Sequence, residues 1–157
     1  MKKLILYYSY GGNTRKIAKL IQNEIGADIA EIETVIQYTG AYDDVVEQGQ
    51  QEVNSGFMPE IKDINVDLAF YDCIIIGSPV WWYTFAPAIK AFLTQNDLSN
   101  KLIYPFATNG GWIGHTFSDF KTICPASTVK RGLDIEFSGS SLVTSESEIK
   151  NWIKAFV

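Results

Sequence analysis

Apolar and polar positions alternate along the chain with two different periods. Residues 3–8 and 72–79 are almost continuously apolar, which is typical of central parallel strands covered on both faces. Residues 13–25 instead place their apolar side chains at helical spacing, and Gly26 follows where a helix C-terminus is expected. The first apolar strand therefore changes into a helix within a few small, polar residues.

The same analysis of spacing predicts the remaining elements. Helices are expected at 85–95, 114–124 and 146–156, with a further helix within 42–56, and strands at 28–33, 101–108 and 131–138. Pro105 counts against the strand at 101–108, because proline donates no ladder hydrogen bond. Strands that alternate with helices form a parallel sheet with right-handed crossovers. We therefore expect an α/β fold, a doubly wound three-layer sandwich with a five-stranded parallel sheet, as one domain over residues 1–157.

Ligands of such sheets bind outside the carboxyl ends of the strands, so the segments after the strands are the first candidates for a site. The first is Ser9-Tyr10-Gly11-Gly12-Asn13-Thr14, which turns directly into a helix N-terminus. Free amides and the helix dipole favour an anion such as phosphate there. The segment is neither a Walker A loop nor a GxGxxG fingerprint. A plain turn with a helix cap fits the same residues, and both interpretations stay open.

Two further segments follow predicted strands. Residues 78–85 hold four aromatic side chains within five positions, 81–85, which favours a flat ligand stacked on one of them over a partner interface or a core cover. Residues 108–115 are rich in glycine, so their backbone can approach the polar edge of a ring. Three such segments at one edge of a sheet predict a site better than any one of them.

Composition excludes several classes of function. The net charge of −5 and the absence of a basic stripe argue against a nucleic-acid binder. Eleven acidic residues and one basic residue, Lys62, lie within 28–72, an acidic surface able to steer a basic partner. No apolar stretch has the length of a membrane helix, and the apolar start is too short for a signal peptide, so we expect a soluble, cytoplasmic protein. Cys73 and Cys124 lie far apart and His115 is the only histidine, which predicts buried thiols and no metal site.

The stretches "SYGGNT", "GSPVWWYTFAPAIKAFL" and "PFATNGG" resemble the three FMN-binding loops of the flavodoxin-like family. The resemblance covers nearly the whole chain, and the little room after Ile135 is similar to the short-chain members. It implies strand order 2-1-3-4-5 with FMN where the first and third strands part. The chain departs from the family pattern at Gly11, where a hydroxyl residue is usual, which removes one expected phosphate donor.

Positions that match the family loops imply a cofactor site with three parts. The phosphate would be held by Ser9, Gly11, Gly12, Asn13 and Thr14; one face and edge of the isoalloxazine by Pro79, Val80, Trp81, Trp82 and Tyr83; the other edge by Thr108, Asn109, Gly110 and Gly111. The resemblance assigns no catalytic residue and no metal. Arg15 faces solvent more often than phosphate at such a position, and His115 is more often a surface residue than a proton donor.

The resemblance implies electron transfer through a non-covalently bound flavin, exchanged with a redox partner protein or a small-molecule acceptor by a monomer or a homodimer. The alternative is an FMN-dependent NAD(P)H:quinone-type reductase, against which the bulky run Trp81–Tyr83 argues mildly, because a stacked side chain excludes a second flat ligand. An interaction module that binds no cofactor also stays open. A receiver domain is disfavoured because the first strand ends in Tyr7-Tyr8-Ser9 rather than in acidic residues.

Overall fold

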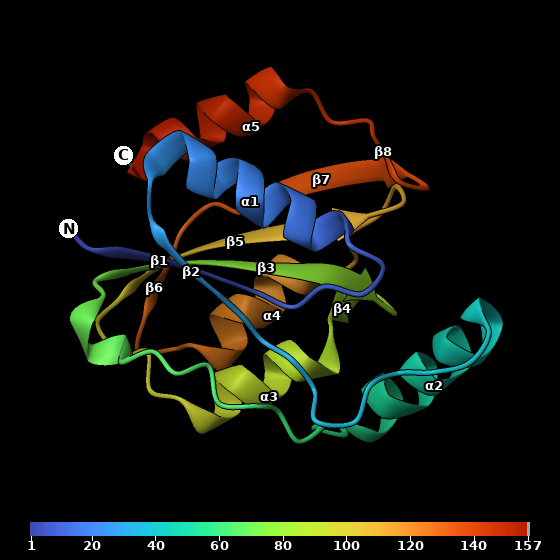
Figure 1. The fold of residues 1–157 in the computed structure, drawn as a ribbon. Coiled ribbons are helices and arrows are strands. Elements are labelled where there is room, and N and C mark those ends of the chain that lie inside the picture. The colour runs from blue at the N-terminus through green and yellow to red at the C-terminus, as the bar shows by residue number, and fades with distance from the viewer. Residues whose placement is uncertain (157) are drawn as a thin grey trace.

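The computed structural model describes residues 1–156 as an α/β fold around a mostly parallel sheet (Figure 1). Its parallel strands are ordered β2 (Asp28–Glu31), β1 (Lys3–Tyr7), β3 (Cys73–Trp81), β5 (Leu102–Asn109) and β7 (Leu133–Ser138). These are the five expected strands in the order 2-1-3-4-5, so the predicted fold class is confirmed. Three short strands were not foreseen: β4 (Thr84–Phe85), β6 (Thr128–Val129) and β8 (Ser141–Leu142).

Helices cover both faces of the sheet (Figure 1). One face carries α1 (Asn13–Ile25) and α5 (Glu146–Ile153), and the other carries α3 (Pro87–Gln95) and α4 (Thr116–Ile123). The helix α2 (Tyr42–Ser55) stands at the side of the molecule, beyond the carboxyl ends of the strands. Two short 3₁₀ turns, η1 (Leu68–Phe70) and η2 (Lys154–Phe156), complete the described elements.

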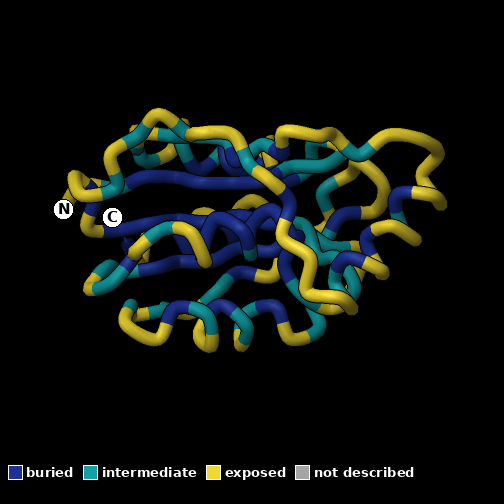
Figure 2. The backbone as a smooth tube through the Cα atoms, turned by 90° about the horizontal axis from the view of Figure 1, so that it is seen from below, coloured by how far each residue is buried: buried dark blue, intermediate teal, exposed yellow. Residues whose placement is uncertain are grey.

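The core consists of two apolar clusters, one on each side of the sheet. Alternate residues of β1 separate them: Leu4 and Leu6 join the cluster beneath α3 and α4, whereas Ile5 and Tyr7 join the one beneath α1 and α5. This alternation follows from the twofold side-chain period of a strand, and it explains why the run is apolar throughout. Figure 2 shows long buried runs through the middle of the molecule, which correspond to β1, β3 and β5, and connections that are mostly exposed.

Helix ends follow the chemistry expected from the sequence. Gly26 and Gly56 close α1 and α2 in the left-handed region, with φ of 67° and 71°, where glycine carries no steric cost. Ser145 caps α5 by accepting a hydrogen bond from the Glu148 amide at 3.2 Å. The helix expected within residues 42–56 is therefore present and ends where the glycine predicted.

Pro105 lies inside β5, although proline counted against a strand there. On the side of β5 away from β3, the neighbouring strand is interrupted: β6 pairs with Leu102 and Ile103, and β7 pairs from Phe106 onward. Because Pro105 falls between these two pairings, the ladder bond that it cannot donate is not needed. The fifth strand of the sheet is thus built from two pieces, of which the sequence pattern predicted only the longer.

The segment that carries α2 starts and ends at one place beside β2. Thr34 and Ile61 form an isolated antiparallel bridge. The Val35 amide donates to the Glu60 carbonyl at 2.9 Å, and the Lys62 amide donates to the Glu33 carbonyl at 2.8 Å. The two arms of the segment, residues 33–36 and 58–62, therefore form a short ribbon from which α2 extends (Figure 1).

Over residues 1–156, every helix falls short of the length and apolar character needed to cross a membrane.

Candidate functional site

A cleft of about 710 Å³ opens at the carboxyl edge of the sheet. It lies where the segments after β1, β3 and β5 meet, as expected for a doubly wound sheet. Of the residues expected at a site, those that line it are Gly11, Asn13, Pro79, Val80, Trp81, Trp82, Thr108, Asn109 and Gly110. A second hollow of about 400 Å³ shares Tyr10 and Gly11 with the cleft and adds Ser9 and Gly12. Residues far apart in the sequence thus gather around one opening.

The segment after β1 presents backbone donors to open space. Gly11 and Gly12 adopt φ of 82° and 99°, and a methyl group at either would meet no atom within 4 Å. The N-cap residue of α1 is Gly12, which has no side chain to cap the helix, and the first backbone bond of the helix runs from the Lys16 amide to the Gly12 carbonyl at 3.0 Å. The amides that precede this bond have no partner in the helix ladder. Together with the helix dipole they favour a negatively charged group at this place.

Thr14 lies behind this segment. Its hydroxyl is 2.7 Å from the hydroxyl of Thr108, and both side chains are buried. Ser9 faces the second hollow, and its hydroxyl accepts a hydrogen bond from the Arg15 amide at 3.2 Å. The Thr14 hydroxyl therefore connects the first segment to the end of β5 rather than lining the cleft.

The segment after β3 is a tight hairpin. Trp81 pairs with Thr84 across it, so only Trp82 and Tyr83 form the turn, and their φ values are 48° and 74°. Such two-residue turns need positive φ at both positions and favour Asn-Gly. A bulky residue in this region costs about 1–2 kcal/mol, so other contacts must hold the turn. One is the hydrogen bond from the Trp82 indole to the Val46 carbonyl of α2 at 2.9 Å.

Trp81 lies at the centre of an aromatic cluster. The rings of Tyr8, Tyr10 and Tyr38 meet it edge-on at centroid distances of 6.0, 5.9 and 4.9 Å. The Tyr38 hydroxyl donates to the Glu52 carboxylate of α2 at 2.5 Å. Burial raises the pKa of Tyr38, and of Tyr8, well above the usual value, so both phenols stay protonated at neutral pH. This cluster fixes Trp81 as one wall of the cleft.

The segment after β5 is held by its own asparagine. The Asn109 amide group donates to the Asp134 carboxylate at 2.5 Å, and its carbonyl oxygen accepts from the Gly111 amide at 2.8 Å. Methyl groups added at Gly110 or Gly111 would meet nothing within 4 Å, so this backbone is open to a ligand. The structure places Gly111 and Tyr83 outside the set of lining residues; the Tyr83 ring packs instead on Trp112 at 4.7 Å.

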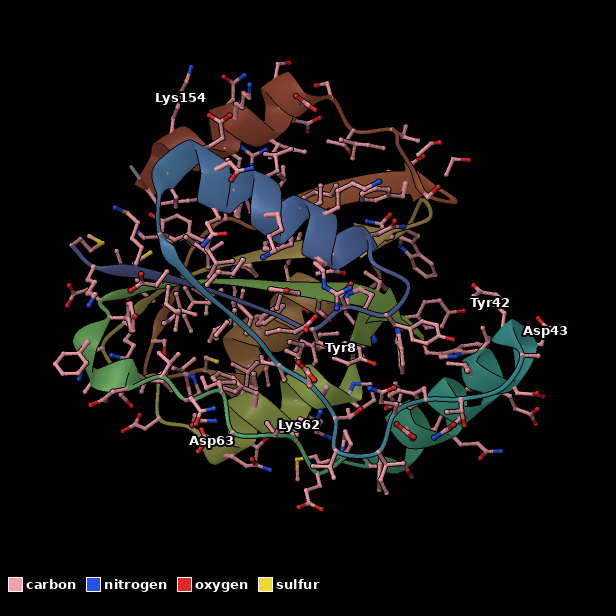
Figure 3. The ribbon with its side chains drawn as sticks, viewed as in Figure 1. Tyr8, Tyr42, Asp43, Lys62, Asp63 and Lys154 are labelled. Atoms are coloured by element: carbon pink, nitrogen blue, oxygen red, sulfur yellow. The ribbon has the colours of Figure 1, made fainter. Side chains whose placement is uncertain are left out.

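Two groups of lining residues were missed from the sequence: Tyr42, Val45, Val46 and Gly49 of α2, and Phe137, Gly139 and Ser140 around the β7–β8 turn. Figure 3 shows Tyr42 and Asp43 at the outer end of α2. The turn is joined to the first segment, because the side-chain amide of Asn13 donates to the Gly139 carbonyl at 2.9 Å. The rule that found the other segments, a polar turn after a buried strand, also applies to Ser138–Ser141. No comparable signal in the sequence indicated that α2 would line the cleft.

Arg15 and His115, the two charged or titratable candidates that the sequence placed near the site, each contact a carboxylate. The Arg15 guanidinium binds the Glu31 carboxylate, and this hydrogen bond raises the pKa of Arg15. His115 lies outside the cleft lining, where its Nδ1 is 2.5 Å from the Asp119 carboxylate. Among residues 1–156, no group of three or more His, Cys, Asp or Glu side chains is arranged to hold a metal ion. The cleft thus combines a helix N-terminus, which favours negative charge, with aromatic and backbone walls.

Comparisons with known proteins agree on one family for this chain. A family model described as Flavodoxin matches residues 2–156. Flavodoxin 1 of Escherichia coli K12 is 26% identical over 106 residues, which are 65% of this chain and 46% of that protein. The chain thus matches about half the length of its curated relatives.

Two solved structures resemble nearly the whole chain. A putative flavoprotein from Bacteroides eggerthii is 28% identical, with a TM-score of 0.84 over 98% of this chain and 96% of that one. A flavoprotein from Lactobacillus acidophilus, solved in complex with FMN, is 29% identical, with a TM-score of 0.77 over 96% of this chain and 97% of that one.

Proposed function

The chain belongs to the flavodoxin family, and from that premise we propose that it binds FMN in the cleft and takes part in electron transfer. The observation that carries this proposal is the convergence of the segments after β1, β3 and β5 on one cleft. One segment offers anion donors and the other two offer an aromatic wall and an open backbone. A phosphate joined to a flat ring system needs this combination.

FMN, when bound, supplies reversible transfer of one or two electrons. The chain's own residues would bind and orient it. Backbone amides at Gly11–Thr14 and the Ser9 hydroxyl would hold the phosphate, Pro79–Trp82 would form one side of the ring site, and the backbone of Asn109–Gly111 would meet a polar edge. The edge-on tyrosines around Trp81, of which Tyr8 is buried and Tyr38 partly buried, keep that wall rigid.

The role of an electron carrier is our first choice. Exchange with a redox partner protein or a small-molecule acceptor, in the cytoplasm, belongs to the same proposal. A second candidate is an FMN-dependent NAD(P)H:quinone-type reductase. The face that α2 adds to the cleft, with Tyr42, Val45 and Val46, supports it, because a flat acceptor needs an apolar wall beside the ring.

The first test is the visible absorption spectrum of the freshly purified protein, followed by denaturation and identification of what is released. A two-banded flavin spectrum with FMN released supports the proposal. A colourless protein that takes up no added FMN contradicts it. Addition of NADH or NADPH to the same sample then separates the candidates, since only a reductase oxidises them directly and turns over with a quinone.

A variant of the anion site sharpens this test. Gly12 has a φ of 99°, so Gly12→Ala strains the backbone whose amides would hold the phosphate. We expect FMN affinity to fall while riboflavin affinity, which involves no phosphate, stays unchanged. Equal loss for both flavins would place the phosphate elsewhere. Gly26→Ala, also at positive φ with open space around it but at the far end of α1, is the matched control.

A further inference from the structure

The Trp82–Tyr83 turn is held by a small set of contacts from residues that do not line the cleft. The His115 amide donates to the Tyr83 carbonyl at 2.8 Å. A methyl group at Gly114 would lie 2.3 Å from that carbonyl oxygen, so the chain approaches the turn as closely as a glycine allows. The two segments after β3 and β5 are therefore in direct contact at the turn.

Asp119 of α4 joins both sides of this contact. Its Oδ2 atom accepts a hydrogen bond from the Thr84 hydroxyl at 2.5 Å and lies 2.5 Å from the Nδ1 atom of His115. Thr84 is the residue that follows the turn, and His115 is the residue whose amide holds the turn's carbonyl. One carboxylate oxygen thus ties together the two residues that confine Trp82 and Tyr83.

We infer that Asp119 is a positioning residue for the cofactor site. It lies outside the residues that line the cleft, and it acts by holding Thr84 and His115 so that the turn keeps its left-handed conformation. That conformation orients the Trp82 indole toward α2, where it donates to the Val46 carbonyl. The expected effect of Asp119 on FMN affinity rests on the proposed FMN site. Its expected effect on the turn does not, because that effect can be measured in the protein without cofactor.

The test compares Asp119→Ala with Asp119→Asn. Both hydrogen bonds converge on one oxygen, which an asparagine carbonyl can replace as an acceptor. We expect Asp119→Ala to raise the dissociation constant for FMN about tenfold, because a turn that is ordered only part of the time must be ordered when the cofactor binds. We expect Asp119→Asn to restore most of the affinity. Lys121→Ala, on an exposed residue of the same helix, is the control that leaves affinity unchanged.

A second measurement uses the protein without FMN. Hydrogen exchange of the His115 amide and the Trp82 indole N–H, followed by NMR, reports the two bonds that fasten the turn. Asp119→Ala should accelerate both and Thr84→Val should do the same. The double variant should exchange little faster than Asp119→Ala, because that change already removes the contact that Thr84→Val removes. This readout stands whether or not FMN binds, so its failure is distinguishable from failure of the proposed function.

Unchanged exchange at both protons in Asp119→Ala would overturn the inference. So would an Asp119→Asn variant as impaired as Asp119→Ala, since that would assign the effect to the negative charge and not to the hydrogen bonds. Additive losses in Asp119→Ala and Thr84→Val would also contradict it, because they would place the two residues in separate contacts.

Discussion

Replacing Gly77 by alanine tests how tightly the sheet is packed beneath the cleft. Gly77 lies on β3 opposite Phe106 of β5. A methyl group at Gly77 would fall 2.0, 2.3 and 2.6 Å from three atoms of the Phe106 ring. Carbon atoms need about 3.5–4.0 Å, so the ring must withdraw by about 1.5 Å. Phe106 is completely buried and contacts the Trp152 ring at 6.3 Å between centroids, so this movement disturbs the core.

Overpacking of this kind costs about 3 kcal/mol in the free energy of unfolding. For a chain of this length we expect the melting temperature to fall by about 6–12 °C, measured by thermal and urea unfolding of the protein without FMN. The wall residues Pro79–Trp81 continue the same strand, so FMN affinity should also fall. Phe106→Leu should relieve the clash, and the double variant should be more stable than the sum of the single effects.

Gly110→Ala is the matched control, because a methyl group there meets no atom within 4 Å. It should change the free energy of unfolding by less than about 0.5 kcal/mol. A Gly77→Ala variant as stable as this control, or one that Phe106→Leu fails to improve, would refute the packing argument.

Three further predictions concern single side chains. Arg15→Gln should change FMN affinity by less than about twofold in a fluorescence titration, because Glu31 already holds the guanidinium. Thr108→Val should destabilise the fold by about 1–3 kcal/mol in urea unfolding, since it leaves the buried Thr14 hydroxyl without its partner; the double Thr14→Val, Thr108→Val variant should recover part of this loss. Burial raises the pKa of the Cys73 thiol from 9.0 to about 11. Between these values the unfolded chain loses the proton and the folded chain keeps it, so stability should fall as pH rises from 9 to 11. Cys73→Ala should flatten that slope.

The spacing of apolar residues predicted the helices and strands well, because most of these elements bury either one face or both faces in the core. The apolar runs of β1 and β3 and the spacing along α1 and α5 leave few alternatives, and the positions after the strands then predicted most of the lining. The two-piece fifth strand was not predictable, because Pro105 is acceptable only next to an interruption in a strand some 25 residues away.

The missed parts of the site depend on contacts across the fold. A turn made by Trp82 and Tyr83 contradicts local turn propensities, and it exists because α2, α4 and the segment after β5 hold it. The hydroxyl pair of Thr14 and Thr108 joins residues 94 positions apart. No pattern within the α2 sequence indicated that its Gly49 would approach the Trp81 ring closely enough for an added methyl to lie 3.3 Å away.

The ribbon at Thr34 and Ile61 has a consequence for how such a protein can diverge. Because the segment that carries α2 leaves and rejoins the fold at bridged positions, its length and content can change without moving β1, β2 or β3. The same segment supplies part of the cleft wall. Insertions, deletions and substitutions in this segment can therefore remodel one side of the opening, while the segment after β1 and the parallel sheet keep their arrangement.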